Sequence, residues 1–286
     1  MTVDLALPQT LSGLAEIADR YRVLLCDVWG VVHNGVARYA DAVGALRAFR
    51  RGGRHVVLIT NAPRPAWSVI RQLDEIGVDR DAYDAIVTSG DVTVTLLTRM
   101  GASRVHHLGP DRDLPLYQGL AVELSDIDSA SVSVCTGLVD DEVETVADYE
   151  DRLQAMARRG LPMLCANPDL VVERGGKLVL CAGALAVRYR EIGGAVTLIG
   201  KPYPAIYDAA MEQIAEVAGG AVPKAAVLAI GDGAATDIRG ANQAGFDSLF
   251  IVAGIHAEEL AAASAGPDFF ARHGARPVAI MPHLSW

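Results

Sequence analysis

Short apolar runs of strand length recur along the chain and alternate with stretches whose apolar residues repeat with the period of a helix. The strand-like runs begin with VLLCDVW at 23–29 and end with VAIMP at 278–282, and helical patterns such as YADAVGALRAFRRGG at 39–53 lie between many of them. This alternation predicts an α/β fold with parallel sheets. The other strand-like runs are HVVLITN, AIVTSG, RVHHLG, SVSVCTG, LPMLCANPD, KLVLCAG, AVTLIGKP, VLAIGDG and SLFIVAG.

Four of these runs end in polar residues that a turn follows. They are Asp27 in CDVWG, Thr60 and Asn61 in ITNAP, Lys201 in IGKP, and Asp232 in IGDG. In open parallel sheets, ligands bind outside the carboxyl ends of the strands. We therefore expect two acids, a hydroxyl and a lysine from distant parts of the chain to surround one site.

These residue types suit the chemistry of a phosphate ester. A carboxylate such as Asp27 attacks phosphorus and forms an aspartyl phosphate, and a hard divalent cation held by oxygen ligands offsets the repulsion between two anions. Asp27 and Asp232 would supply such ligands, Thr60 would hydrogen-bond a phosphoryl oxygen, and Lys201 would balance charge. Helix capping after a glycine turn is the alternative role for Asp232.

Composition limits the classes of partner. The chain has 286 residues, a formal net charge of −10 and four cysteines. The length favours two domains, and the acidic charge disfavours nucleic acid and anionic membrane surfaces. Because no apolar run approaches the ~20 residues of a membrane span and the N-terminus lacks a basic start, we expect a cytoplasmic protein with buried, reduced thiols. The last segment, from residue 255, predicts a helix and a short strand, and we assign it no chemistry.

At this spacing the motifs resemble those of the haloacid dehalogenase (HAD) superfamily, and more narrowly its class IIA branch of sugar and nitrophenyl phosphatases. Asp27 matches the family's nucleophile, Thr60-Asn61 its second motif, and Lys201 in GKPYPAIYD its third. This match implies that Thr60 and Asn61 together hold the phosphoryl oxygens of the substrate. The segment GDGAATDIRGANQAG resembles the family's fourth motif. This resemblance implies Asp232 as metal ligand and Asp237 as a further acid of the metal site.

The resemblance implies a layout and a cofactor. A Rossmann-like core with a parallel sheet would take residues 1–81 and 192–286, and an α/β cap of type II (C2) would occupy residues 82–191. It also implies Mg²⁺ as cofactor, a small phosphorylated metabolite as substrate, and a homodimer, since caps of this class often pair.

Three further residues are candidates for substrate contact. Arg64 in NAPRP has the reach to contact a phosphate, with a solvated loop arginine as the alternative. Asn167 and Asp169 lie in ANPDLVVERGGKLVLCAGAL, which resembles the family's cap segment. By residue type alone these two are turn formers, and only the resemblance implies substrate contact for them.

The chain departs from the family pattern at Trp29. Phosphatases of the family normally have an aspartate two residues after the nucleophile, where it protonates the leaving group and activates water. Trp29 retains the backbone carbonyl that binds the metal but lacks the acid, whose contribution is typically about 10²–10⁴ in rate. The indole has two alternative roles, stacking on a substrate ring or filling space beneath the cap.

Three interpretations of this departure remain open. In the first, His33 replaces the missing acid and base. In the second, the enzyme acts on activated substrates or transfers the phosphoryl group. In the third, hydrolysis is lost, and the protein is a catalytically weak phospho-ligand-binding or regulatory protein. We favour the enzymatic interpretations, and so predict a Mg²⁺-dependent phosphatase with Asp27, Lys201 and His33 as candidate catalytic residues.

Overall fold

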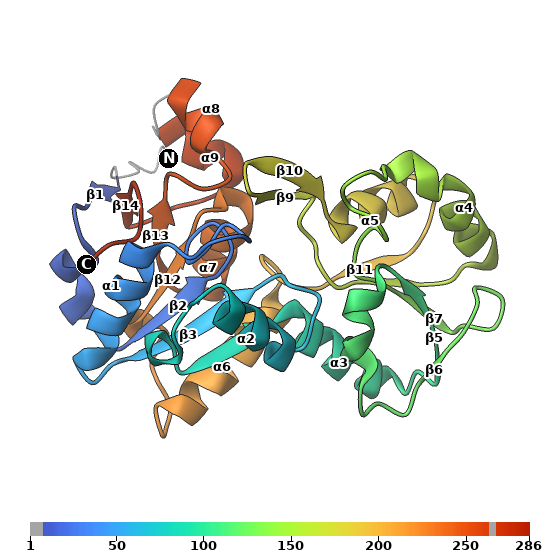
Figure 1. Ribbon diagram of the computed structural model, residues 1–286, viewed down its shortest axis with the longest axis horizontal. Helices are drawn as coiled ribbons and strands as arrows, with labels where there is room; N and C mark the ends of the chain where they lie inside the picture. The colour runs from blue at the N-terminus through green and yellow to red at the C-terminus, as the bar shows by residue number, and fades with distance from the viewer. Residues whose placement is uncertain (1–7, 263–266) are drawn as a thin grey trace, which may run out of the picture. The chain divides into compact units, whose positions relative to one another are not determined.

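The computed structural model describes residues 8–262 and 267–286 and divides into two compact units (Figure 1). The first comprises the described residues within Met1–Thr60, Gln72–Val87 and Tyr207–Trp286, and the second comprises Asn61–Arg71 and Thr88–Ile206. The α/β architecture is confirmed. This division assigns residues 61–71 and 192–206 to the second unit, whereas the sequence analysis placed them in the core, and the predicted boundaries stay a prediction.

The first unit is built on a seven-stranded sheet with the order β1-β14-β13-β12-β2-β3-β4. Its neighbours from β1 to β3 pair in parallel. Every residue of β2 is buried, which explains why VLLCD reads as a continuous apolar run instead of an alternating one. The strands are β1 (Gln9–Thr10), β2 (Val23–Asp27), β3 (His55–Thr60), β4 (Ala85–Thr88), β12 (Val227–Gly231), β13 (Asp247–Ile251) and β14 (Ala279–Met281).

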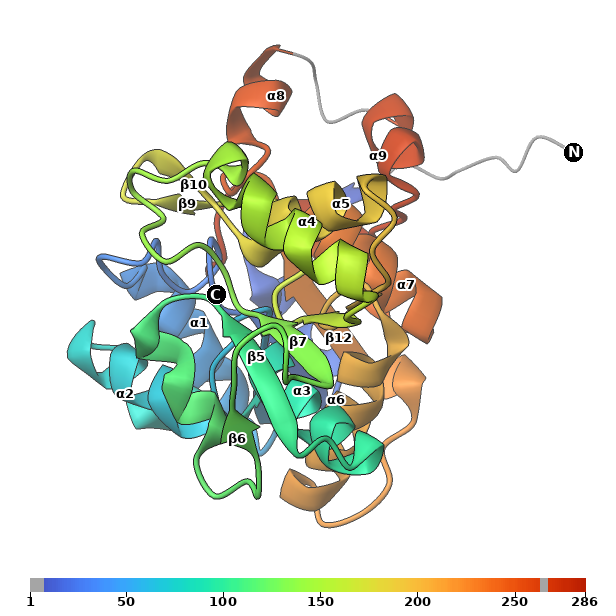
Figure 2. The same ribbon diagram turned by 90° about the vertical axis from the view of Figure 1, so that its right-hand side faces the viewer.

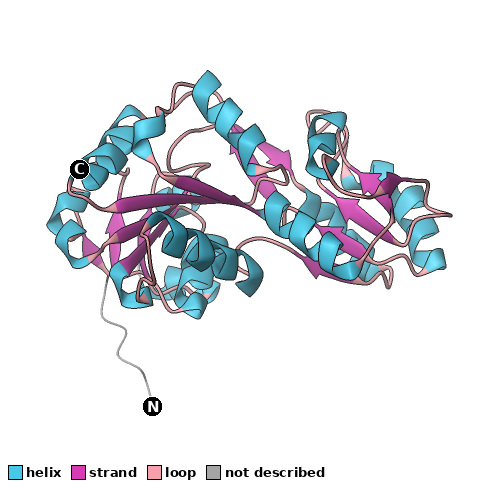
Figure 3. Cartoon of the chain, turned by 90° about the horizontal axis from the view of Figure 1, so that it is seen from below, coloured by secondary structure: helices cyan, strands magenta, loops and turns pink. Residues whose placement is uncertain are grey.

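Helices lie on both faces of this sheet (Figure 3). In α1 the buried residues Ala42, Val43, Leu46 and Phe49 form one stripe of the helix, as expected for a helix packed on a core. The helices with residues in this unit are α1 (Ala40–Arg51), α2 (Ala66–Glu75), α6 (Pro204–Val217), α7 (Arg239–Ala244), α8 (Ala257–Ala262) and α9 (Pro267–His273).

The second unit has its own five-stranded parallel sheet, in the order β11-β8-β7-β5-β6. Helices α4 and α5 lie side by side on one of its faces (Figure 2) and bury Leu153, Met156, Leu185 and Tyr189 in one apolar cluster. The elements are β5 (Arg104–Leu108), β6 (Glu123–Leu124), β7 (Val132–Cys135), β8 (Met163–Cys165), β11 (Val196–Leu198), the antiparallel pair β9 (Val171–Arg174) and β10 (Lys177–Leu180), and helices α3 (Ser89–Met100), α4 (Glu150–Arg159) and α5 (Ala182–Glu191).

Two compositional expectations can be compared with this structure. All four cysteines are buried thiols outside any disulfide, as predicted. Burial raises the pKa of the Cys165 thiol to about 12, which makes it a poor nucleophile and metal ligand. Among the helices of the described residues, none is both long and apolar enough to cross a membrane.

Candidate active site

Three aspartates of the first unit converge at the carboxyl edge of its sheet. Asp27 ends β2, Asp232 follows β12, and Asp237 lies in the single π-helical turn Ala234–Ile238. Because β12 and β2 are parallel neighbours, with Ile230 opposite Cys26, both strands end at the same edge. Each aspartate contributes a carboxylate oxygen to a set that lies within 4.8 Å of one another.

Burial makes this convergence electrostatically demanding. The exposed fractions of Asp27, Asp232 and Asp237 are only 4%, 7% and 7%. Carboxylates that lie this close together and are this deeply buried are unfavourable as anions unless a cation or protons offset their charge. An all-oxygen donor set is also what Mg²⁺ and Ca²⁺ prefer. The three side chains therefore fit a hard divalent cation.

Glycines allow the loop after β12 to bring its two acids inward. Gly233 donates its N–H to the Asp237 carboxylate at 2.9 Å, and its carbonyl accepts from the Asp237 N–H at 2.8 Å. A Cβ on Gly231 would lie 2.2 Å from the Asp237 Cβ. Asp237 thus braces the turn that carries Asp232, and the motif requires glycine at position 231.

Asp232 also lies against two glycines, Gly30 and Gly254, that are far apart in the sequence. Its Oδ2 accepts from the backbone N–H of Ile255 at 2.9 Å. A Cβ on Gly30, whose φ is +82°, would lie 2.1 Å from that oxygen, and a Cβ on Gly254 would lie 2.0 Å from it. Sequence reasoning missed Gly30, Gly254 and Ile255, because their relation to Asp232 is set only by tertiary packing.

Thr60 ends β3, the other parallel neighbour of β2. Asp27 is paired with Ile59, so Thr60 lies one residue beyond that partner, at the same edge of the sheet. It is 5% exposed. The structure thus brings the hydroxyl-bearing residue to the edge where the acids meet, as the sequence predicted for residues that follow parallel strands.

Trp29 and His33 belong to one short segment that folds back on itself. The two residues form a β-bridge, and their rings meet edge to face, with centroids 4.9 Å apart. A Cβ on Gly35 would lie 2.4 Å from the indole. These contacts favour the space-filling role for Trp29, which is partly exposed.

His33 is almost completely buried, at 1% exposure. Its Nδ1 accepts a hydrogen bond from the Gly35 N–H at 2.8 Å, which assigns the ring proton of the neutral form to Nε2. Only Nε2 would then be placed to exchange a proton with a substrate. The role of His33 as a replacement for the missing acid stays a prediction.

The second unit brings together Asn61, Asp169 and Lys201. The Asn61 side chain donates to Asp169 Oδ1 at 3.0 Å and to the Lys201 carbonyl at 3.2 Å, and it accepts from the Lys201 N–H at 2.7 Å. Lys201 is 4% exposed. Asn167 accepts from the Asp169 N–H at 3.1 Å, a local turn contact that fits its residue type.

Arg64 is partly buried and lies in a charged environment of the second unit. Burial lowers the pKa of its guanidinium, against the attraction of Asp113. Burial likewise raises the pKa of Asp113 to about 6, and Arg64 opposes that rise. This environment differs from that of a solvated loop arginine, and phosphate contact by Arg64 stays a prediction.

Sequence reasoning also missed Ser89, the first residue of α3. Its buried hydroxyl lies 2.8 Å from the Asn61 carbonyl and 3.0 Å from the Ala62 carbonyl. It therefore ties the turn after β3 to the start of α3. One signal in the sequence could have identified Ser89. It lies at the end of the strand-like run AIVTSG, and other runs carry their polar site residues at that position.

Comparisons with known proteins agree on one family. A haloacid dehalogenase-like hydrolase model matches residues 24–123, and a second HAD-hydrolase-like model matches residues 198–275. A crystal structure of a haloacid dehalogenase-like hydrolase from Brucella suis 1330 is 45% identical, covers 97% of this chain and 100% of its own, and has a TM-score of 0.87.

Two comparisons lead to Mycobacterium tuberculosis. Its D-glycerol 3-phosphate phosphatase is 30% identical over 251 residues, which cover 85% of this chain but only 66% of the relative. A crystal structure of a glycerol phosphate phosphatase from that organism, in complex with calcium, is 25% identical, covers 94% of this chain and 76% of its own, and has a TM-score of 0.67.

Proposed function

Since this chain belongs to the haloacid dehalogenase-like hydrolase family, we propose that it is a Mg²⁺-dependent phosphatase that acts on a small phosphorylated metabolite. The observation that carries the proposal is the convergence of Asp27, Asp232 and Asp237 at one edge of the sheet. Asp27, at the end of β2, would both bind the cation with Asp232 and attack phosphorus, and Asp237 would support the metal-binding loop.

Asp27 is the proposed nucleophile. One of its carboxylate oxygens attacks phosphorus, the ester bond to the leaving oxygen breaks, and an aspartyl phosphate forms. Water then attacks that phosphorus, releases inorganic phosphate and regenerates the carboxylate. Two displacements replace one in this scheme, and most of the rate enhancement comes from positioning and charge stabilisation.

Asp27, Asp232 and the Trp29 carbonyl would hold Mg²⁺, with Asp237 bracing the loop through Gly233. When bound, Mg²⁺ offsets the repulsion between the carboxylate and the phosphate ester. The calcium complex of the glycerol phosphate phosphatase supports a divalent-cation site in such a protein. Thr60 would donate to a phosphoryl oxygen, Lys201 would balance its charge, and Asn61 would hold Lys201 in place.

The proposed substrate class is a small phosphate monoester. The two glycerol phosphate phosphatases support a polyol phosphate such as glycerol 3-phosphate as the first compound to test. Arg64, Asn167 and Asp169 are the proposed contacts to the remainder of the substrate. The homodimer stays a prediction that light scattering tests, and the cytoplasmic location stays a prediction as well.

Trp29 supports a second candidate function. Its ring packs on His33 and against Gly35 and offers no acid for the leaving group. A protein that binds a phosphorylated ligand, or that stops at the aspartyl phosphate, would retain the acidic cluster and need no proton donor there. This candidate predicts tight ligand binding without turnover.

Turnover of p-nitrophenyl phosphate with Mg²⁺ separates these candidates, because its leaving group needs no proton. We expect the wild type to release nitrophenol, and Asp27→Asn to release it at least ~10²-fold more slowly, since the nucleophile is lost. Equal rates in the two proteins would refute Asp27 as nucleophile. A phosphorylated Asp27 that accumulates, detected by mass spectrometry of acid-quenched protein, would favour the second candidate.

A further inference from the structure

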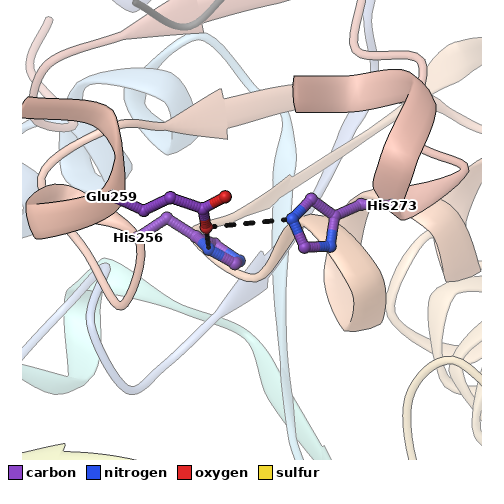
Figure 4. Close-up of side chains that lie close together, drawn as sticks. All are labelled: His256, Glu259 and His273. Carbon is purple, nitrogen blue, oxygen red and sulfur yellow. Dashed lines mark hydrogen bonds and ion pairs between the residues drawn. The ribbon is translucent and has the colours of Figure 1, made fainter. Parts of the chain in front are cut away.

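The segment to which the sequence analysis assigned no chemistry brings two histidines and a glutamate together (Figure 4). Glu259 Oε2 lies 3.1 Å from His256 Nδ1 and 3.9 Å from His273 Nε2, and the potential ligand atoms of all three lie within 4.8 Å of one another. We propose that His256, Glu259 and His273 form a second metal site, which binds a divalent transition ion such as Zn²⁺.

Local structure explains why these side chains meet. His256 immediately precedes α8, and Glu259 lies in the first turn of that helix. Residues three apart on a helix face the same side. His273 is the last residue of α9, which Phe269 and Phe270 anchor in an apolar cluster with Phe250. The donors therefore come from the start of α8, with the residue that precedes it, and from the end of α9.

The donor set distinguishes this site from the aspartate cluster. Two imidazoles and one carboxylate suit Zn²⁺ and its neighbours, whereas Mg²⁺ prefers oxygen ligands alone. Zinc bonds to nitrogen and oxygen of ~2.0–2.2 Å in a tetrahedral arrangement place neighbouring ligand atoms ~3.3–3.5 Å apart. The observed separations of 3.1 and 3.9 Å differ from these values by only a few tenths of an ångström.

The surroundings orient each ligand. Arg272 donates to the other carboxylate oxygen of Glu259, Oε1, at 3.1 Å, so that Oε2 is directed at the imidazoles. The Phe269 ring lies 5.1 Å from the ring centroid of His256 and 4.8 Å from that of His273. Partners of this kind, which fix the ligands in place, typically accompany protein metal sites.

An ion in solution can reach both imidazoles, which bind a metal in their neutral form. The His256 and His273 side chains are 17% and 24% exposed.

One hydrogen bond links this site to the loop of the aspartate cluster. The Ala234 N–H donates to His256 Nε2 at 3.3 Å, and Ala234 lies two residues after Asp232. A metal at His256 Nδ1 moves the ring proton to Nε2, so that Ala234 loses its acceptor. Occupancy of the His256–Glu259–His273 site should therefore disturb the Asp232 loop.

Isothermal titration of the full chain with Zn²⁺, in the presence of Mg²⁺, tests the proposal without any use of turnover. We expect a zinc-binding event in the wild type that weakens ~100-fold or more in Glu259→Gln and in His273→Ala, by analogy with the 10–100-fold losses seen even for outer partners. The matched controls are Glu258→Gln and His283→Ala, which change exposed residues of the same types. They should bind zinc as the wild type does.

Co²⁺ supplies a second readout, because its visible bands intensify when protein ligands replace its octahedral shell of water with a tetrahedral one. The wild type should develop these bands, and His273→Ala, checked for folding by circular dichroism, should not. Zinc binding that persists at wild-type affinity in both Glu259→Gln and His273→Ala, or that is absent from the wild type, would overturn the proposal. Binding that disappears instead in Asp232→Asn would assign the zinc to the aspartate cluster and overturn it as well.

Discussion

The side-chain amide of Asn61 and the backbone of Lys201 hydrogen-bond in both directions. Asn61 Oδ1 accepts from the Lys201 N–H at 2.7 Å, and Nδ2 donates to the Lys201 carbonyl at 3.2 Å. Gly200, with φ +117°, permits this approach, because a Cβ there would lie 2.5 Å from Asn61 Oδ1. Asn61 therefore acts as a positioning residue for Lys201, and this role accounts for an asparagine that directly follows a strand.

Removal of this amide should misplace Lys201. We expect Asn61→Ala to lower kcat for p-nitrophenyl phosphate about tenfold or more and to lower the free energy of unfolding by ~1–3 kcal/mol, since buried backbone groups lose their partners. Asn61→Asp keeps an oxygen that accepts from Lys201 but cannot donate, so its effect on kcat should be smaller. Steady-state kinetics and urea denaturation measure both quantities. Identical kcat values in wild type and Asn61→Ala would contradict the positioning role.

Restoration of the missing acid should reveal what limits the reaction. We expect Trp29→Asp to raise kcat for an alkyl phosphate such as glycerol 3-phosphate by about 10²–10⁴, because the alkoxide leaving group needs a proton. The change with p-nitrophenyl phosphate should be smaller at the first step. Trp29→Asn, which removes the indole without adding an acid, is the matched control. An equal gain in both variants would show that the indole, and not the absence of an acid, restricts the wild type.

Where the sequence predicted structure well, the signal was local and strong. Buried parallel strands read as apolar runs, and the polar residues that follow them predicted that Asp27, Thr60 and Asp232 lie at one edge of a sheet, where the structure has them. Helix α3 was not anticipated. Its segment DVTVTLL alternates β-branched residues as a strand would, and in the structure Thr93, Thr95 and Thr98 each donate to the carbonyl four residues earlier.

The other features that the sequence analysis did not predict have a different physical origin. The antiparallel pair of β9 and β10 includes VVER, a run too short and too polar to stand out. Asp232 contacts Gly30 from a distant part of the chain, and Gly254 and Ile255 from beyond the next strand, β13, and no local pattern records these contacts. The sequence analysis did not predict the His256–Glu259–His273 cluster, because His273 lies beyond the first helix of that segment and no local pattern links it to the other two residues.

The aspartate cluster should lower the stability of the metal-free protein while it allows the folded protein to bind a metal. In EDTA, we expect Asp232→Asn to melt at a higher temperature than the wild type, because one of three mutually repelling, buried charges is removed. With Mg²⁺ the order should reverse, since a ligand that binds only the native state raises its melting temperature, and the variant should bind Mg²⁺ at least ~10-fold more weakly. Differential scanning fluorimetry with and without Mg²⁺ measures this. Melting temperatures that respond equally to Mg²⁺ would rule out Asp232 as a ligand.

Asp113 should make the stability of the chain depend on pH. It is 3% exposed, and burial raises its pKa from 3.8 to about 6. Between these values the folded protein binds more protons at this residue than the unfolded chain, so the free energy of unfolding should fall as pH rises from about 4 to about 6. The full cost at neutral pH is at most ~3 kcal/mol, and the pKa from which it follows already includes the opposing attraction of Arg64.

Asp113→Asn removes the ionisation and should abolish this decline. Urea denaturation at pH 4.5 and pH 7, compared between wild type and variant, measures the effect, and the variant should be the more stable protein only at the higher pH. Asp111→Asn, an exposed aspartate of the same turn, is the control and should leave the wild-type pH dependence in place. If Asp113→Asn destabilises the protein more at pH 7 than at pH 4.5, attraction to Arg64 outweighs the cost of burial.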